Sequence, residues 1–279
     1  MKKQRIIVLD MDGSLLDDNK KISQKSVNFL KKVQAYSYKI VLASGRPFRA
    51  VKPYYEQLGL DTLVICYNGA VIYNPQTSKF LYKKTYPREY ILNIVETIGE
   101  SNFENIVVED FNHLEYLEKN DTLSVFAHPY DMKITYGDFK TNLPKEPLSC
   151  VFALKDKKDV PLFIKLGANK KHRNINVRFW DGTLLAETYF SDINKYTSLL
   201  KVLEYYNIPI ENSICFGDGD NDLEMVSQAG IGVAMKNSTS KFLKQSADML
   251  TLEDNNHDGI AETLKVLIPE VNDEVYFYN

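Results

Sequence analysis

Residues 5–14 read RIIVLDMDGS, an apolar run that ends in two aspartates two positions apart, Asp10 and Asp12. A continuous apolar run of this length is typical of a strand that is buried on both faces of a parallel sheet. Ligands of such sheets bind beyond the carboxyl ends of the strands, which is where Asp10 lies. Aspartate and glycine are also common in ordinary turns, and a D-x-D-G arises by chance in about 0.07 of chains this long. The stretch alone therefore predicts a strand and only weakly indicates a site.

Alternating strands and helices continue on both sides of this run. After a predicted helix over residues 23–35, apolar strands follow at 39–44 and 62–66. The pattern returns in the last third of the chain, with helices near 195–206, 221–229, 239–246 and 258–267 and strands at 213–217, 231–235 and 248–252. Strands that alternate with helices in this way favour a parallel sheet covered by helices. The predicted fold class is α/β, with a doubly wound, Rossmann-like parallel sheet as its core.

A long insert separates the two α/β blocks. It has about 105 residues, roughly 85–190, although a parallel crossover needs only about a dozen. Its predicted elements are strands at 104–110, 113–119, 149–155 and 177–189 and helices near 88–99 and 159–172. The DGT at 181–183 resembles a hairpin turn, which favours an antiparallel sheet. We therefore expect a core of residues 1–84 and 191–279, with an inserted α+β domain of residues 85–190.

Composition and charge narrow the classes of ligand. The chain has 279 residues, 44% of them hydrophobic, which is enough to bury a substantial core in two domains. The formal net charge is −3 and no long basic run occurs, so the electrostatic signature of a nucleic-acid-binding protein is absent. Small molecules are therefore the favoured ligands, and the pattern says nothing about the oligomeric state.

Hydropathy and cysteine spacing indicate the compartment. No apolar stretch approaches the roughly 18 residues that span a bilayer, and the start of the chain has only four apolar residues before a charge, too few for a secretory signal. We expect a cytoplasmic protein without a membrane partner. Cys66, Cys150 and Cys215 are widely spaced and form no C-x-x-C pair, which argues against a zinc site and against a disulfide framework. They are predicted to be buried thiols.

The strand predicted at 39–44 also ends in polar residues. Ser44 and Gly45 precede Arg46 and a helix whose first turn holds Pro47, a residue favoured there. A strand end that leads into a helix N-terminus presents free N–H groups to an anion such as phosphate. The alternative is that Ser44 is an ordinary helix cap, worth about 1 kcal/mol.

The strand predicted at 213–217 leads into an acidic cluster. Its members are Asp218, Asp220, Asn221 and Asp222. Helix capping explains one or two of these residues but not all of them. Lys195 stands at the start of the preceding helix, where a cation opposes the helix dipole. A solvated surface lysine is the alternative for this residue.

The topology predicts that these loops meet at one edge of one sheet. Two carboxylates about 4 Å apart repel by about 4 kcal/mol at an effective dielectric of about 20. Several such pairs rival the roughly 5–15 kcal/mol stability of a domain, so a cation is needed. Oxygen ligands with positions left for water suit Mg²⁺, which commonly pairs carboxylates with substrate phosphate. A small phosphate ester is the predicted substrate, and a carboxylate that attacks phosphorus forms an aspartyl-phosphate.

Four segments, taken in order, resemble the motifs of the haloacid dehalogenase superfamily of phosphohydrolases: DMDGSLL at 10–16, ASGR at 43–46, Lys195, and GDGDND at 217–222. The NGA at 68–70, the insert, and HDGIA at 257–261 further resemble its Cof-type branch, which carries a class IIB cap. The resemblance implies a Mg²⁺-dependent phosphatase of small phosphorylated metabolites, with sugar phosphates as the substrate class and the insert as a cap that selects substrates.

The same resemblance implies a role for each matching residue. Asp10 is implied to be the nucleophile and Asp12 the general acid/base. Mg²⁺ is implied to be held by the Asp10 carboxylate, the Asp12 backbone carbonyl and Asp218, with Asp222 in support. The residues implied to hold the phosphate are Ser44, Gly45, Lys195 and Asn221, and Arg46 is a candidate for contact with the substrate or the cap.

Three departures from the family pattern accompany this resemblance. Ser14 stands where threonine is usual, which keeps the hydroxyl; Tyr196 follows the lysine where glycine is usual; and MKNS at 235–238 replaces the commoner Met-Gly-Asn-Ala. Crowding near the phosphate pocket and an altered substrate are two consequences that stay open.

Other functions compete with the phosphatase reading. A dehalogenase is disfavoured because that branch lacks the second aspartate, present here as Asp12. A signalling receiver domain has no reason to carry the insert, and its acidic pair is not arranged as D-x-D. A phosphomutase of the same superfamily and a catalytically silent phosphometabolite-binding protein stay open as alternatives.

Overall fold

The computed structural model describes residues 4–124, 132–167, 174–180 and 182–272. The chain divides into two compact units. Unit 1 comprises Met1–Tyr82 and Ile193–Asn279, and unit 2 comprises Lys83–Asp192. Each of these limits lies within two residues of the boundaries expected from the sequence. In the part of the chain that the structure describes, no helix is both long enough and apolar enough to cross a membrane.

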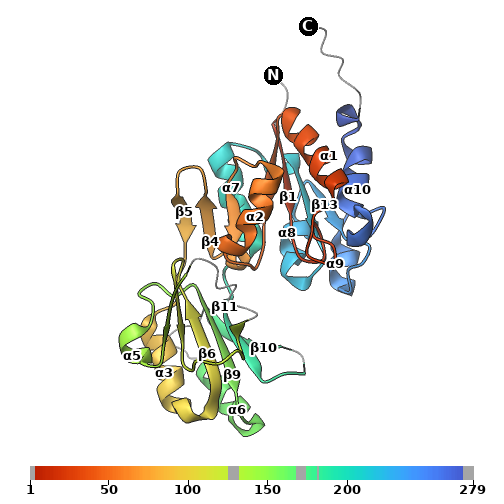
Figure 1. The fold of residues 1–279 in the computed structure, drawn as a ribbon. Helices are drawn as coiled ribbons and strands as arrows, with labels where there is room; N and C mark the ends of the chain where they lie inside the picture. The colour runs from red at the N-terminus through yellow and green to blue at the C-terminus, as the bar shows by residue number, and fades with distance from the viewer. Residues whose placement is uncertain (1–3, 125–131, 168–173, 181, 273–279) are drawn as a thin grey trace. The chain divides into compact units, whose positions relative to one another are not determined.

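The main sheet of unit 1 is parallel, with the strand order β14-β13-β12-β1-β2. Its strands are β1 (Arg5–Leu9), β2 (Tyr38–Leu42), β12 (Ser213–Gly217), β13 (Ile231–Ala234) and β14 (Met249–Leu250). The run Ile6–Leu9 of β1 is fully buried, as its continuous apolar pattern predicts. The expected doubly wound sheet is confirmed (Figure 1).

Helices follow the strands of this sheet. They are α1 (Gln24–Ala35), α2 (Phe48–Leu58), α7 (Lys195–Tyr206), α8 (Leu223–Ser227), α9 (Lys241–Ser246) and α10 (Gly259–Leu267). From β1 the chain crosses through α1 to β2 on one side, and from β12 through α8 to β13 on the other. Because such crossovers are right-handed, these opposite directions place α1 and α8 on opposite faces of the sheet.

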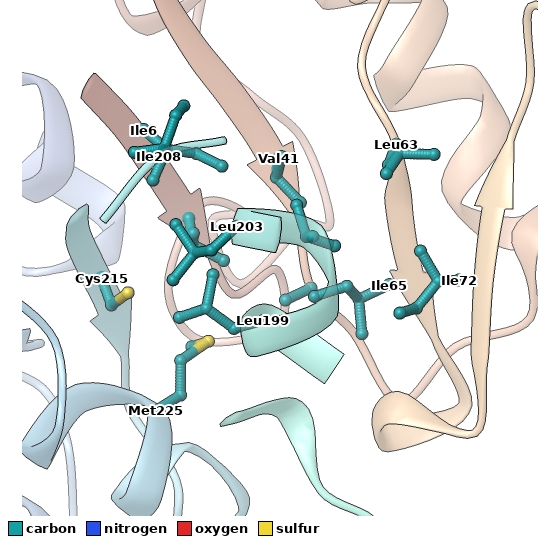
Figure 2. Packing of buried hydrophobic residues seen from close by; sticks show 13 residues of the cluster. Ile6, Val41, Leu63, Ile65, Ile72, Leu199, Leu203, Ile208, Cys215 and Met225 are labelled. Carbon is teal, nitrogen blue, oxygen red and sulfur yellow. The ribbon is translucent and has the colours of Figure 1, made fainter. Parts of the chain in front are cut away.

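One face of the main sheet packs against α7. Figure 2 shows Leu199 and Leu203 of this helix beside Ile6, Val41 and Cys215 from three strands. The start of α7 is fixed by Asn194, whose side chain accepts a hydrogen bond from the Thr197 N–H at 2.8 Å while Thr197 bonds back. The three cysteines are free and buried, as predicted.

The strand expected at 62–66 departs from the prediction. It forms β3 (Val64–Cys66) in a separate sheet of order β3-β4-β5, with β4 (Val71–Asn74) and β5 (Lys79–Lys83). Outside that sheet β3 makes a single parallel bridge, from Ile65 to Ala43 beyond the end of β2. The reason is that the chain turns sharply after Cys66 and doubles back, so β3 pairs with its antiparallel neighbour β4.

Unit 2 is an α+β structure, as expected for the insert. Its sheet has the order β10-β11-β9-β6-β7-β8 among the described residues. The strands are β6 (Phe103–Glu109), β7 (His113–Tyr116), β8 (Lys133–Tyr136), β9 (Ser149–Leu154), β10 (Ile175–Phe179) and β11 (Leu185–Phe190), and the helices are α3 (Arg88–Ile98), α5 (Phe139–Asn142) and α6 (Val160–Gly167).

The predictions for unit 2 hold in outline only. Its pairings are antiparallel except that β7 pairs with β8 in parallel. The sequence pattern did not predict β8 or α5. The expected hairpin joins β10 to β11, with the Thr183 N–H bonded to the Trp180 carbonyl, while Asp181 of the predicted turn and residues 168–172 of the predicted helix lie outside the described residues.

Candidate active site

The carboxyl ends of β1 and β12 are adjacent, because the two strands pair in parallel with Leu9 opposite Phe216. Asp10 and Asp218 follow these strands directly, and the Asp10 N–H donates to the Phe216 carbonyl at 3.1 Å. Asp222 comes from the turn after β12. One carboxylate oxygen from each of the three aspartates lies within 4.8 Å of the others. We call Asp10, Asp218 and Asp222 the carboxylate cluster.

Lys195 lies inside this cluster. The first residue of α7 is fully buried, and its Nζ is 2.5 Å from Asp10 Oδ1 and 2.6 Å from Asp222 Oδ1. The surface-lysine alternative is therefore wrong. Burial alone lowers the pKa of Lys195, but the charges of Asp10 and Asp222 outweigh it and raise this pKa overall. Lys195 stays protonated, and the cluster still has more negative than positive charge.

Asp222 stabilises the loop that carries Asp218. Its Oδ2 accepts hydrogen bonds from the N–H groups of Asp218 and Gly219, each at 3.1 Å. Its Oδ1 accepts from Lys195 at 2.6 Å. A side chain at Gly217 would place its Cβ 2.3 Å from the Asp222 Cβ, so the loop requires glycine there. Both Asp222 oxygens are thus occupied, which suits a supporting role rather than a direct ligand.

The cluster fits a divalent cation. Asp10 Oδ2 is buried and has no hydrogen-bond partner, a costly arrangement for a carboxylate oxygen. Burial, followed by the charge of Asp222, raises the pKa of both Asp10 and Asp218. Gly13 keeps space open beside Asp218, since a Cβ there would lie 2.2 Å from Asp218 Oδ2. Free carboxylate oxygens in this setting are the donors that Mg²⁺ prefers.

Ser44 lies beside the end of β2 and is 1% exposed. Its N–H donates to the Ile65 carbonyl at 2.9 Å, and its Oγ accepts from the Arg46 N–H at 3.1 Å. The alternative that Ser44 is an ordinary helix cap is wrong, because Pro47 is the N-cap of α2 and the cap has no side-chain hydrogen bond. Gly45 packs against Asn68, whose side chain would lie 3.1 Å from a Cβ at this position.

Asp12 is separate from the carboxylate cluster and is bound by two cations. Arg46 donates to it twice, from Nε to Oδ2 at 2.6 Å and from Nη2 to Oδ1 at 2.5 Å, and Lys20 Nζ donates to Oδ1 at 2.9 Å. Partial burial opposes ionisation, but these hydrogen bonds lower the pKa of Asp12 overall. The predicted contact partners of Arg46 were the substrate and the cap, so its bond to Asp12 was not anticipated.

Two further residues at the site were not predicted. Lys20 reaches Asp12 from a turn in which its own φ is +59° and its carbonyl accepts from Tyr54 OH. Asn68 accepts a hydrogen bond from Asn221 Nδ2 on its Oδ1 at 3.0 Å. The NGA motif was the only sequence signal for Asn68, and nothing in the pattern singles out Lys20.

The structure shows the surroundings of the three departures. Tyr196, in the first turn of α7, packs against the buried core and not against the carboxylate cluster. Lys236 is exposed and contacts Glu253 at 3.0 Å. The hydroxyl of Ser14 is buried without a hydrogen-bond partner. The third residue of MKNS, Asn237, donates to the Gly13 carbonyl at 2.8 Å and so supports the first motif.

Comparisons with known proteins agree with this architecture. Residues 7–264 match the family model of haloacid dehalogenase-like hydrolases. A 5-amino-6-(5-phospho-D-ribitylamino)uracil phosphatase of Bacillus subtilis is 31% identical over 94% of this chain and 97% of its own length. A pyridoxal phosphate phosphatase of Escherichia coli is 28% identical over 92% of this chain and 96% of its own.

Solved structures agree with this family match. A haloacid dehalogenase-like hydrolase from Bacteroides thetaiotaomicron superposes with a TM-score of 0.83 at 28% identity, covering 95% of this chain and all of that one. The chain therefore belongs to the haloacid dehalogenase-like hydrolases, and its curated relatives place it among the phosphatases of that family.

Proposed function

We propose that this protein is a cytoplasmic, Mg²⁺-dependent phosphatase that hydrolyses small phosphorylated metabolites, with sugar phosphates as the substrate class, through an aspartyl-phosphate. The observation that carries the proposal is the carboxylate cluster, in which Asp10 Oδ2 is buried without a partner while Lys195 holds Oδ1 at 2.5 Å. The names of the relatives support small phosphorylated metabolites as substrates.

The reaction has two displacements at phosphorus. Asp10 attacks the phosphoryl group, so a bond forms between its carboxylate oxygen and phosphorus while the bond to the leaving oxygen breaks. Asp12 gives its proton to that leaving oxygen. Asp12 then takes a proton from water, the water oxygen bonds to phosphorus, and the bond to Asp10 breaks, which releases inorganic phosphate and restores both aspartates.

Other residues of this chain bind and orient the phosphoryl group. Lys195 fixes the Asp10 carboxylate and supplies positive charge, Ser44 offers a buried hydroxyl at the end of β2, and Asn221 offers an amide. Arg46 and Lys20 favour the ionised form of Asp12, so Asp12 must move off Arg46 before it can carry the proton that it donates.

A metal ion completes this set of residues. The Asp10 carboxylate, whose Oδ2 has no hydrogen-bond partner, the Asp218 carboxylate and the Asp12 backbone carbonyl would hold Mg²⁺. Asp222 would keep the Asp218 loop in place. When bound, Mg²⁺ neutralises the charge that builds up on the phosphoryl oxygens. The insert, residues 85–190, is proposed to select among leaving groups.

Release of inorganic phosphate from p-nitrophenyl phosphate and from a panel of sugar phosphates tests the proposal. We expect Mg²⁺-dependent turnover that EDTA abolishes and that renewed Mg²⁺ restores. Asp218→Asn should lower turnover by about 100-fold or more, because it removes a charged ligand. Asp220→Asn is the matched control, since Asp220 is exposed in the same loop and accepts a hydrogen bond from Ser240 Oγ.

Product analysis separates the phosphatase from the phosphomutase alternative. Free phosphate with no isomerised ester supports the phosphatase. An isomerised ester in place of free phosphate would contradict it, as would the lack of turnover of every ester in the panel.

A further inference from the structure

The turn after β3 has an unusual backbone. Tyr67, Asn68 and Gly69 have φ values of +51°, +52° and +105°, so three consecutive residues have positive φ. Two of them are not glycine, and L-residues adopt this conformation only at a free-energy cost. Strain of this kind is retained where surrounding contacts impose it, and it is often found at functional sites.

Backbone hydrogen bonds tie this turn to the segment that carries Ser44. The Asn68 N–H donates to the Ser44 carbonyl at 3.1 Å, and the Tyr67 N–H donates to the Arg46 carbonyl at 3.2 Å. The Asn68 side chain also packs on Gly45, where a Cβ would lie 3.1 Å from both atoms of its amide group. The turn therefore fixes the path of the chain from Ser44 to Arg46.

A second side of the same turn supports the start of α7. Ser198 Oγ, which is buried, donates to the Gly69 carbonyl at 2.6 Å. A Cβ on Gly69 would lie 2.3 Å from the Asn194 carbonyl oxygen, so the turn and the helix N-terminus approach closely. Lys195 follows Asn194 directly and points into the carboxylate cluster.

The third contact of the turn is made by a side chain. Asn68 Oδ1 accepts a hydrogen bond from Asn221 Nδ2 at 3.0 Å, across 153 positions of sequence. Residues 67–69 thus contact all three segments that carry the proposed phosphate-binding residues Ser44, Lys195 and Asn221. A turn that served only to reverse the chain into β4 would need none of these contacts.

We propose that Asn68 is a positioning residue for phosphate binding, and this inference rests on the proposed function. Its left-handed backbone holds Ser44 in place, and its side-chain amide orients Asn221. The backbone and side-chain parts of this role can be separated. Glycine at this position allows the left-handed conformation and removes the side chain that contacts Asn221 and Gly45.

The test compares Asn68→Gly with Asn207→Gly. Asn207 is the matched control, because it is also left-handed, with φ +54°, and it caps the far end of α7 through its backbone N–H. We expect Asn68→Gly to raise the KM for p-nitrophenyl phosphate and the inhibition constant of inorganic phosphate by about 10-fold, with a much smaller change in kcat. Asn207→Gly should leave both constants unchanged.

A double-mutant cycle tests whether Asn68 acts through Asn221. If it does, the combination of Asn68→Gly and Asn221→Ala should weaken phosphate binding no more than the worse single variant. Additive losses would overturn the coupling. Unchanged phosphate binding in Asn68→Gly, or an equal loss in Asn207→Gly, would overturn the positioning role.

Hydrogen exchange separates failure of this inference from failure of the proposed function. Amides of residues 218–222 should exchange faster in Asn68→Gly than in Asn207→Gly, whether or not the protein turns over any ester. If the wild type hydrolysed no ester, the proposed function would fail while the exchange data still decided the inference. Equal exchange in the two variants would contradict the inference on its own.

Discussion

Each unit of the molecule buries a carboxylate that has an oxygen without a hydrogen-bond partner: Asp10 Oδ2 in unit 1 and Glu115 Oε1 in unit 2. Burial is the largest cause of a raised pKa in both. Asp10 forms an ion pair with the buried Lys195 and lies close to two further carboxylates that come from remote segments. Glu115 has the Thr135 hydroxyl, and His113 Nε2 lies 3.8 Å away. Burial with an unpartnered oxygen therefore does not make a site.

Unit 1 differs from unit 2 because side chains from several separate segments converge at one site. Side chains from two strand ends, one turn and one helix start meet there, and the chain bears the cost of crowding like charges. Glu115 lies on β7, and its contacts with His113 and Thr135 come from the same strand and from β8, so they follow from the pairing of these two strands. Four substitutions test this difference between the two units, and they are given in order of decreasing expected effect.

Asp10→Asn should have the largest effect. The amide cannot attack phosphorus, so kcat for p-nitrophenyl phosphate should fall by roughly 10⁴-fold or more. The variant should still fold, because it removes one of the repelling charges near Asp222 and Asp218. Steady-state kinetics and the melting temperature check both statements. Turnover within tenfold of the wild type would refute the role of Asp10 as nucleophile.

Lys195→Met should cost unit 1 about 3–5 kcal/mol of unfolding free energy, because it leaves Asp10 and Asp222 buried without their cation. Denaturant unfolding with probes in unit 1 measures this loss. Lys201→Met is the control on the same helix, since Lys201 is only partly buried and lies over the Tyr82 ring. Equal stability losses in the two variants would show that the buried ion pairs of Lys195 add nothing to the stability of unit 1.

Asp12→Asn should lower kcat by about 10²–10⁴-fold without unfolding the protein, because general acid/base catalysis contributes roughly this factor. Its side chain is 41% exposed and lies outside the carboxylate cluster, so less of the structure depends on its charge. An ester with a poor leaving group should lose more activity than p-nitrophenyl phosphate. The same loss for both esters would count against proton donation by Asp12.

Glu115→Gln should have the smallest effect and the opposite sign, a gain of about 1 kcal/mol in the stability of unit 2 at pH 8, because it removes a buried charge with an unpartnered oxygen. Burial raises the pKa of Glu115 in the folded protein. The protonated side chain therefore contributes stability at pH values below its unfolded pKa, and this contribution is lost as pH rises through the folded pKa. The difference between the variant and the wild type should therefore grow from pH 4 to pH 8.

Hydrogen exchange of the β7 amides at the two pH values measures that difference. Glu118→Gln is the control, since Glu118 is exposed just beyond the same strand. A stability difference for Glu115→Gln that stayed constant with pH would mean that Glu115 does not titrate in the folded unit over this range.

The sequence predicted the parts of the site that depend on topology. Asp10 and Asp218 could be placed together because the carboxyl ends of neighbouring parallel strands share one edge of a sheet. A lone lysine at a helix start is ordinarily a surface residue, so the placement of Lys195 at this edge depended on the predicted topology and on the family resemblance. Its burial depends on the partners that the fold brings to it.

The parts that could not be predicted depend on turn geometry and weak patterns. Lys20 reaches Asp12 only because its turn adopts a positive φ, which a lysine does not signal. The left-handed turn at 67–69 redirects β3 into its own sheet, and an apolar run looks the same in either sheet. In unit 2, the strand β8 has only four residues and none of them is buried, so its parallel pairing with β7 was missed.

Trapping the phosphoryl group on the protein tests whether Asp10 is the nucleophile. In Asp12→Asn, p-nitrophenyl phosphate still supplies a good leaving group for the first displacement, whereas the second lacks its general base, so the aspartyl-phosphate should accumulate. Acid quenching of this variant followed by mass spectrometry should find about one phosphoryl group per chain on Asp10, labile to hydroxylamine and absent when Asp10 is also replaced by Asn. Release of p-nitrophenol without any protein-bound phosphoryl group, or a phosphoryl group on another residue, would contradict the account.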